Sequence, residues 1–373
     1  MRHKESEYMH WAKTASRARY NLATSGVGAF PLRELPFDPG QLEINGENKY
    51  GYRPLQQAIG AKYGVDPEWV VEAAGTSFAN HLAMATLLEP GDQVVIEHPA
   101  YGPLVDVARY LEADIRRFAR REENGYAVDP AEVRRALTPQ TKLIVITNLH
   151  NPSAALTPEA VLREIGDMAG SVGAHVLVDE VYLDAVYENT PRSAVHLGPE
   201  FVVTNSLTKV YGVSGLRCGW ILAQADLARR MLRLNDVYAA TAVHPAELLS
   251  VAAFQHLERL RDRARRIVEA DRGALSAFLD RCDGIAAPRT EWGTTAFLRL
   301  EECGASAGTA DWQSAGRLPA CPTCDTFFGR LRQEYETSAV PGRFFEMPHH
   351  LRIGMGVDSE MFAEGLRRIE AAL

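Results

Sequence analysis

The sequence predicts an α/β fold: a large, mostly parallel sheet covered by helices, plus a smaller α+β domain. Between 70 and 255, short apolar runs alternate with helical stretches, which is typical of parallel strands joined by crossover helices. Beyond 240 the pattern changes, because 245–281 is largely helical and rich in Arg and Glu, and short strands follow around 285–300. A chain of 373 residues can hold two such domains, since a single core rarely grows beyond about 250–300 residues.

Domain limits and elements follow from the same patterns. We assign 1–40 to the small domain as an N-terminal segment, 41–255 to the large domain and 256–373 to the small C-terminal domain. The expected strands are 93–98, 142–148, 174–180, 201–205 and 219–223. The expected helices are 5–20, 78–89, 102–112, 130–137, 158–171 and 225–238, and a further helix carries Leu55, Ile59 and Tyr63 on one face.

Composition narrows the possible partners and compartments. The net charge of −8 argues against nucleic acid or an anionic membrane as a partner. The charged N-terminus and the lack of a run of about 18 apolar residues predict a cytoplasmic protein without a membrane span. Five cysteines are too few and too irregularly spaced for a disulfide framework. Cys321 and Cys324 have the spacing of half a zinc site or a redox pair, but nothing completes a metal site, so no metal is predicted.

The stretch 204–220 carries the strongest functional pattern. Apolar residues lead to Ser206, Lys209 follows in a glycine-containing turn, and Arg217 stands eight residues further on. The lysine amine can form an imine with an aldehyde cofactor. Ser206, Thr208 and Arg217 suit a phosphate, because a guanidinium binds phosphate through two hydrogen bonds. This combination predicts pyridoxal phosphate.

Other polar residues follow the ends of expected strands, where the functional loops of such a sheet lie. Gly75, Thr76 and Ser77 precede a helix, whose first N–H groups form an anion site. Asp179 ends an apolar strand, where an unpaired carboxylate is costly. Facing a pyridine nitrogen, it would keep that nitrogen protonated and let the ring withdraw electrons.

The pattern S-x-x-K-x-x-G-x-x-G-x-R-x-G-W around Lys209 resembles the Schiff-base segment of the fold-type I pyridoxal-phosphate enzymes, and most closely the class I/II aminotransferases. The resemblance covers nearly the whole chain. It implies an aspartate aminotransferase-like fold with a seven-stranded sheet. It also implies a homodimer in which residues of both subunits complete each active site.

The resemblance assigns roles to residues that are ambiguous alone. Tyr101 matches the aromatic residue that stacks on the cofactor ring, and Asn151 and Tyr182 match the groups that hydrogen-bond the cofactor's 3′-oxygen. Ala154 stands where glycine is usual after the Asn-Pro pair, which questions the geometry of that turn. Arg352 matches the arginine that holds the substrate's α-carboxylate, a planar anion that suits a two-pronged cation.

Two further matches leave alternatives open. Ser25 and Gly26 lie in the segment that crosses the active-site mouth in the family and touches the substrate, although a simple loop is an equal alternative. Tyr50, preferred over Tyr52, matches the tyrosine that reaches the partner subunit's cofactor phosphate, although glutamine replaces the usual arginine after Leu55. A tyrosine of the core or of an interface is the alternative.

The function implied by the resemblance is transfer of an amino group between an L-amino acid and a 2-oxo acid. Lys209 would hold the cofactor and then act as general base, while Asp179 stabilises the developing charge and Arg352 orients the carboxylate. A lyase, cyclase or oxidase of the same fold shares every cofactor residue, and TSGV and HNPSA resemble the capreomycidine synthases, which cyclise an amino acid.

Two alternatives lie outside this enzyme class. One is a regulator that uses such a domain as an effector sensor, which needs an appended DNA-binding domain for which this chain has no room. The other is an α/β binding protein in which Lys209 is incidental. The sequence does not determine the amino acid used, because side-chain specificity depends on which groups line the pocket.

Overall fold

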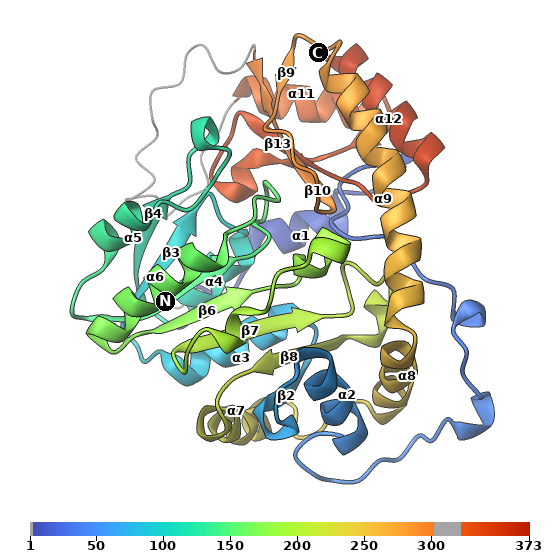
Figure 1. Cartoon of the computed structure of the whole chain (residues 1–373). Coiled ribbons are helices and arrows are strands. Elements are labelled where there is room, and N and C mark those ends of the chain that lie inside the picture. Colours follow the sequence, from blue (N-terminus) through green and yellow to red (C-terminus); the bar gives the residue numbers. More distant parts are fainter. Residues whose placement is uncertain (1–2, 302–321) are drawn as a thin grey trace.

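The computed structural model describes residues 3–301 and 322–373. Its centre is a seven-stranded sheet in the order β2-β8-β7-β6-β5-β3-β4 (Figure 1). Neighbouring strands are parallel from β7 to β4, whereas β8 is antiparallel to both of its neighbours. The strands are β2 (Val70–Ala74), β3 (Gln93–His98), β4 (Asp114–Ala119), β5 (Thr141–Thr147), β6 (His175–Asp179), β7 (Phe201–Ser206) and β8 (Cys218–Leu222). The predicted fold class is therefore confirmed.

All five expected strands are present within about one residue of their predicted ends, whereas β2 and β4 were not predicted. The sequence of β4, DIRRFA, places charged residues among the apolar ones, and β4 lies at the edge of the sheet. Strand β2 also lies at an edge, and Glu72 interrupts its apolar residues. Edge strands often carry charged residues, so a search for continuous apolar runs does not find them.

Helices cover both faces of this sheet, because successive side chains of a strand point to opposite faces. Buried residues of α3, α4 and α7 pack on one face, and buried residues of α2, α5, α6 and α8 pack on the other. These helices are α2 (Arg53–Tyr63), α3 (Thr76–Leu87), α4 (Gly102–Tyr110), α5 (Pro130–Ala136), α6 (Glu159–Val172), α7 (Ala225–Tyr238) and α8 (His244–Gln255).

Two helix predictions need correction. Helix α3 begins at Thr76 rather than at 78, because Gly75 takes a positive φ of 79° and starts the helix. The N-terminal helix α1 (Glu7–Thr14) is shorter than the expected 5–20. Its first turn is capped by Ser6, and the chain leaves the helix to form β1 (Tyr20–Asn21), which pairs in parallel with β11 (Thr337–Ser338).

The C-terminal part forms a four-stranded antiparallel sheet in the order β12-β13-β10-β9. In Figure 1, the long helix α9, drawn in gold, runs from α8 beside the large sheet to this small sheet. The elements are α9 (Leu257–Leu279), β9 (Ile285–Ala286), β10 (Thr295–Leu300), α11 (Pro322–Gln333), β12 (Val340–Pro341), β13 (His350–Gly354) and α12 (Ser359–Ala372). The exact domain limits at 40/41 and 255/256 stay predictions.

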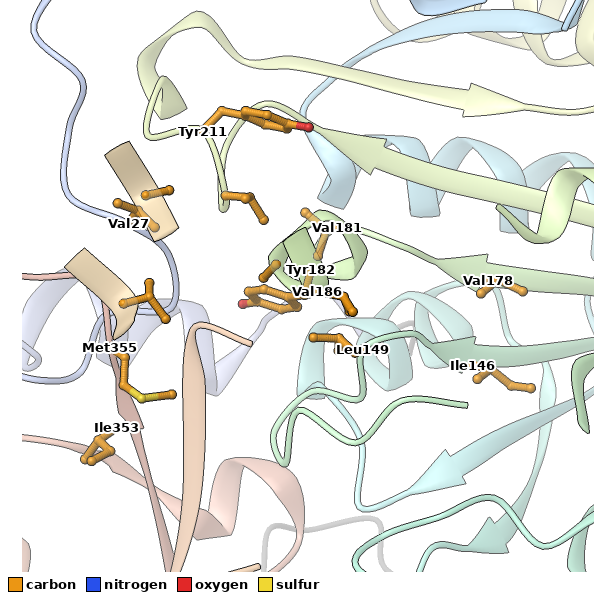
Figure 2. Packing of buried hydrophobic residues seen from close by; sticks show 14 of the residues in the cluster. Val27, Ile146, Leu149, Val178, Val181, Tyr182, Val186, Tyr211, Ile353 and Met355 are labelled. Atoms are coloured by element: carbon orange, nitrogen blue, oxygen red, sulfur yellow. The ribbon is translucent and has the colours of Figure 1, made fainter. Parts of the chain in front are cut away.

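A continuous apolar core joins the two sheets. Figure 2 shows Val27, Ile353 and Met355 on one side of this core and Leu149 and Val186 on the other. All five side chains are less than a tenth exposed. Because protein interiors are close-packed, this contact fixes the small sheet against the carboxyl ends of the large-sheet strands.

Three observations concern what is absent from the described residues. No group of three or more His, Cys, Asp or Glu side chains in this part of the chain is arranged to hold a metal ion. None of the described helices combines the length and apolar character needed to span a bilayer. Cys321 and most of the 301–324 segment, for which no use was predicted, lie outside the described residues.

Candidate active site

A cavity of ≈ 340 Å³ lies at the carboxyl ends of the central strands. Its lining includes residues that we predicted as site residues, although they are far apart in the sequence. These residues are Ser25, Gly26, Thr76, Ser77, Tyr101, Asn151, Asp179, Tyr182, Thr208, Lys209 and Arg217. Gly75 directly precedes Thr76, and Ser206 accepts a hydrogen bond from Thr76, whereas Tyr50 does not line this cavity.

Lys209 follows β7 in a turn that places its amine inside the cavity. Its Nζ donates a hydrogen bond to Ser25 Oγ over 2.6 Å. Burial lowers the pKa of this amine from its usual value, and Arg352 and Arg217 act in the same direction, against Tyr8 and Asp179. A desolvated lysine amine gains neutral character, which suits a nucleophile or a general base.

Asp179, at the end of β6, is 4% exposed. Its Oδ1 accepts a hydrogen bond from the Val181 amide over 3.0 Å, and its Oδ2 accepts one from Asn80 Nδ2 over 2.7 Å. Burial raises the pKa of Asp179 to about 6, although these two hydrogen bonds and Lys209 oppose the rise. The carboxyl group is therefore mostly ionised at neutral pH, although its pKa lies only slightly below 7.

Asn80 is a site residue that sequence reasoning missed. Thr204 Oγ1 donates to Asn80 Oδ1 over 2.6 Å, so the Asn80 amide is held from one side while it donates to Asp179 from the other. The signal was a polar residue one turn after Thr76, on the helix face that also carries Thr76 and Ala83. Asn80 is only 3% exposed, and a buried amide of this kind needs partners.

An anion cradle surrounds the start of α3. Thr76 Oγ1 donates to Ser206 Oγ over 2.7 Å, and Ser206 Oγ lies 2.6 Å from Thr208 Oγ1. Arg217 donates from Nη2 to the Ala74 carbonyl over 3.1 Å, which brings its guanidinium to the same turn. Hydroxyl groups, a guanidinium and the N-terminus of a 12-residue helix together form a site for a phosphate-like anion.

The turn at Gly75 needs glycine for two reasons. Its φ of +79° is a conformation that residues with a side chain rarely adopt. A Cβ at this position would also lie only 2.3 Å from Nη2 of Arg217. The glycine therefore lets the guanidinium approach the start of the helix.

Arg352 on β13 is fully buried. Its Nη1 donates to Asn151 Oδ1 and its Nη2 donates to the Tyr8 hydroxyl, each over 3.0 Å. Its Nε is also buried, and no described residue accepts a hydrogen bond from it. Among the described residues, no carboxylate lies within 4.0 Å of the guanidinium. A buried cation without an anionic partner is costly, so the arrangement suits an incoming carboxylate.

The N-terminal segment supplies two contacts that the sequence did not identify. Tyr8 binds Arg352, and its ring packs edge-on against Tyr101 with centroids 5.5 Å apart. Met9 lines the cavity and lies within hydrogen-bonding range of the Tyr101 hydroxyl. Tyr8 was not predicted as a site residue, because nothing local to α1 points to a residue 344 positions away.

Tyr50 is 53% exposed, and its hydroxyl donates to Asp236 over 2.9 Å, outside the cavity that holds Lys209. Tyr52 instead donates its backbone N–H to Glu72 and packs against His244. The predicted role of Tyr50 involves a second subunit, so it stays a prediction.

Ala154 takes a φ of +63° in the turn after Asn151. The turn therefore has a left-handed backbone conformation at this position, although the residue there is alanine and not glycine.

The residues of the cavity fit pyridoxal phosphate. An anion cradle stands at β2 and α3, a carboxylate stands at the end of β6, and the amine of Lys209 lies on the turn after β7. Asp179 and Arg352 are both buried ionisable groups, and among the described residues Arg352 Nε has no hydrogen-bond partner. A phosphate, a ring nitrogen and an aldehyde would match the three groups in turn.

Comparison with known proteins agrees with this chemistry. A family model described as aminotransferase class I and II matches residues 38–369. A capreomycidine synthase of Streptomyces vinaceus is 28% identical and is aligned over 96% of this chain and 90% of its own length. An aspartate aminotransferase of Streptomyces avermitilis is 26% identical, over 87% of this chain and 80% of its own.

Two solved structures share the fold over the whole chain. A PLP-dependent aminotransferase from Streptococcus suis has a TM-score of 0.88 and 26% identity, with 100% of this chain and 98% of that chain covered. A structure of the PLP-dependent cyclase OrfR has a TM-score of 0.87 and 22% identity, with coverage of 100% and 97%. At that identity the second likeness concerns the fold alone.

Proposed function

Because the chain belongs to the class I and II aminotransferase family and is a pyridoxal-phosphate-dependent enzyme of fold type I, we propose that it moves an amino group between an L-amino acid and a 2-oxo acid. One observation carries the proposal. The desolvated amine of Lys209 shares a single cavity with the buried carboxylate of Asp179 and with an anion cradle.

In this proposal, specific residues contact each part of the cofactor. Bound here, the cofactor supplies an aldehyde for covalent attachment to Lys209 and a ring that withdraws electrons. The anionic carboxylate of Asp179 would keep the ring nitrogen protonated, and the hydrogen bond from Asn80 fixes the orientation of that carboxylate. The phosphate site consists of the α3 N-terminus with Gly75, Thr76, Ser77, Ser206, Thr208 and Arg217. Tyr101 would stack on the ring, and Asn151 and Tyr182 would donate hydrogen bonds to the 3′-oxygen.

The substrate contacts follow from the charges. Arg352 binds the α-carboxylate, and its two terminal nitrogens match the two oxygens of that group. Lys209 Nζ would accept the proton of the substrate's α-carbon as general base and would later donate it as general acid to the former aldehyde carbon of the cofactor, on the other side of the substrate nitrogen. Ser25 and Gly26 line the wall of the same cavity, where they would contact the substrate.

A second candidate is cyclisation of an amino acid, or elimination or oxidation, by the same cofactor site. The observation that favours it is the identity of 28% with a capreomycidine synthase over 96% of the chain. These reactions begin with the same loss of the α-proton, so the residues that hold the cofactor do not separate them.

The deciding experiment incubates the purified protein with a panel of amino acids, with and without a 2-oxo acid, and identifies the products by mass spectrometry. We expect a 2-oxo acid from the donor and a new amino acid from the acceptor. A cyclic or unsaturated product formed without an acceptor would replace transamination by the second candidate.

Lys209→Ala should abolish turnover and the visible absorption of the lysine imine. Lys142→Ala is the matched control, because Lys142 is an exposed lysine on β5. Full turnover in Lys209→Ala would refute the proposed mechanism.

We further propose a homodimer that shares its active sites. Large apolar side chains are exposed near Tyr50, including Ile44 at 79%, Val237 at 77% and Val243 at 69%. Exposed apolar patches of this kind are typical of protein interfaces. Light scattering should give twice the chain mass.

Mixed dimers of Lys209→Ala and Tyr50→Ala chains should also regain activity that neither variant has alone, since one site then contains both intact residues. A cytoplasmic location stays a prediction from the sequence, which cell fractionation would test.

A further inference from the structure

Ser25 makes a contact that the proposed function does not use. Its hydroxyl accepts the hydrogen bond from Lys209 Nζ over 2.6 Å, although the two residues are 184 positions apart. Tyr182 lines the same cavity, and the Ser25 side chain opposes the rise that burial causes in the pKa of its phenol. One hydroxyl therefore lies between the amine that would carry the cofactor and the phenol assigned to the cofactor's 3′-oxygen.

The backbone around Ser25 is fixed on both sides of this contact. Val27 donates its amide to the Lys209 carbonyl over 2.8 Å, and Gly28 donates to the Gly356 carbonyl over 2.7 Å. The Ser25 carbonyl accepts a hydrogen bond from Thr294 Oγ1 over 3.2 Å, and Thr294 directly precedes β10 of the small sheet. These bonds tie the segment to both the large and the small domain, so the hydroxyl has little freedom to move.

Gly26 shows how closely the segment approaches the lysine. A Cβ at Gly26 would lie 2.8 Å from the Lys209 carbonyl oxygen and 3.2 Å from its side-chain Cδ. The absence of a side chain at 26 lets the backbone rest on the lysine, and this contact brings the neighbouring hydroxyl to Nζ.

We propose that Ser25 is a positioning residue for Lys209: its hydroxyl holds Nζ at the angle from which the amine attacks the cofactor aldehyde and later moves the substrate's α-proton. The inference deepens the proposed function and rests on it, since it assumes that Lys209 carries the cofactor. In the attachment step, a C–N double bond replaces the aldehyde C–O double bond. The oxygen leaves as water with the two protons of the amine.

The alternative is that Ser25 only satisfies a buried amine and contributes stability. The two roles differ in what happens at alkaline pH. There the Lys209 amine is neutral in every variant, so the rate at which cofactor-free protein captures pyridoxal phosphate depends on how the amine is oriented. Misplacement by about 1 Å can slow an oriented reaction by up to about 100-fold.

The test measures that capture rate by stopped-flow absorption on cofactor-free protein, without any amino acid, from neutral to alkaline pH. Ser25→Ala should lower the alkaline plateau rate by about tenfold or more. Its pH–rate midpoint should move to lower pH, because the amine loses an acceptor that favours its charged form. Ser25→Thr keeps the hydroxyl and should stay close to the unmodified protein.

Two further variants keep the result interpretable. Ser25→Cys keeps the size of the side chain but is a weak acceptor, so it should be slow like Ser25→Ala. Thr24→Val is the matched control, because Thr24 is the neighbouring residue and its buried hydroxyl has no hydrogen-bond partner within 3–301 and 322–373. This control should capture the cofactor at the unmodified rate.

Unchanged plateau rates in Ser25→Ala and Ser25→Cys would overturn the positioning role, even if both variants unfolded at lower temperature. Capture with a lysine-imine spectrum by Lys209→Ala would instead overturn the proposed function. The two failures are therefore distinguishable in one series of measurements.

Discussion

At the scale of single residues, the site gathers ionisable groups that burial disfavours. Asp179 is buried with a raised pKa, Lys209 is partly buried with a lowered pKa, and Arg352 is buried without a carboxylate within 4.0 Å among the described residues. A protein selected only for stability would replace such groups by apolar ones of similar size. Perturbed ionisable residues that share a cavity indicate chemistry.

The pKa of about 6 for Asp179 predicts how cofactor binding depends on pH. Above pH 6 the carboxylate is ionised and attracts a protonated ring nitrogen, and below pH 6 it is neutral. Affinity of the cofactor-free protein for pyridoxal phosphate should therefore fall as the pH is lowered through about 6. Fluorescence titrations at several pH values measure this.

Asp179→Asn should bind weakly at every pH and lose the step near pH 6. Asn80→Ala should move the step to higher pH, because a hydrogen bond that favours the ionised form is gone. An unchanged profile in Asp179→Asn would assign the pH dependence to another group.

Arg352 gives a second prediction at this scale. Lysine keeps the charge but not the two-pronged geometry, so Arg352→Lys should raise KM for the amino acid more than it lowers kcat. A charge-assisted pair contributes about 1.5–3 kcal/mol, which corresponds to roughly 10- to 150-fold in binding. Steady-state kinetics measure the change, and an unchanged KM would remove Arg352 from the carboxylate site.

At the scale of elements, the anion cradle depends on how one strand passes into one helix. Strand β2 ends at Ala74, Gly75 takes a positive φ, and α3 begins at once with Thr76. Strand β8 runs alongside and starts just after Arg217, which itself adopts a φ of 51°. The cradle therefore exists only because β2 and β8 are neighbours.

Gly75→Ala should weaken cofactor binding by about tenfold or more, because the new methyl group displaces the guanidinium of Arg217. Equilibrium titration with pyridoxal phosphate measures it. Gly91→Ala is the control, since Gly91 has a similar φ of 88° but nothing within 4 Å of the added carbon. Both variants carry the backbone strain, and only the first is expected to lose affinity.

At the scale of the whole molecule, ion pairs connect the large sheet to the C-terminal part. Arg117 on β4 donates from two nitrogens to the two carboxylate oxygens of Glu346, over 2.8 and 2.5 Å. Both side chains are nearly buried, at 5% and 11% exposed. Glu122 binds Arg299 and His350 nearby, and His350 is two positions before Arg352. The charged contacts thus help to hold the strand of Arg352 in place.

Glu346→Gln should lower the free energy of unfolding by about 3–5 kcal/mol, because it leaves the Arg117 cation buried and unpaired. Burial alone would raise the pKa of Glu346, but the pair with Arg117 outweighs it and lowers the pKa. The stabilisation is therefore present above the ordinary carboxyl pKa and is lost as the pH falls through the lower pKa of the folded state.

Urea unfolding at several pH values measures both effects. Glu164→Gln is the control, because its pair with Arg134 is exposed, at 50% and 65%, and should contribute less than about 1 kcal/mol. Equal stability losses in the two variants would contradict the connecting role of Glu346.

The predictions from the sequence agree best with the structure where a short segment has a distinctive pattern of residues. The apolar strands β3, β5, β6, β7 and β8 and the lysine turn were predictable, because alternation of short apolar runs and helices reflects burial on both faces of a parallel sheet. The charged edge strand β4 and the shortened helix α1 were not. Their ends depend on pairing partners from distant parts of the chain rather than on their own composition.

The sequence by itself determined the fold class, because apolar runs alternate with helices along the chain. It also determined the family, the cofactor and a set of residues that lie in one cavity, because short motifs at strand ends indicate each of these. Only the tertiary structure decided that Asn80 supports Asp179, that Tyr8 binds Arg352 and that Ser25 reaches Lys209. The physical reason is that hydrogen bonds act over about 3 Å in space. Residues up to 344 positions apart meet only after the sheet and the N-terminal segment have packed.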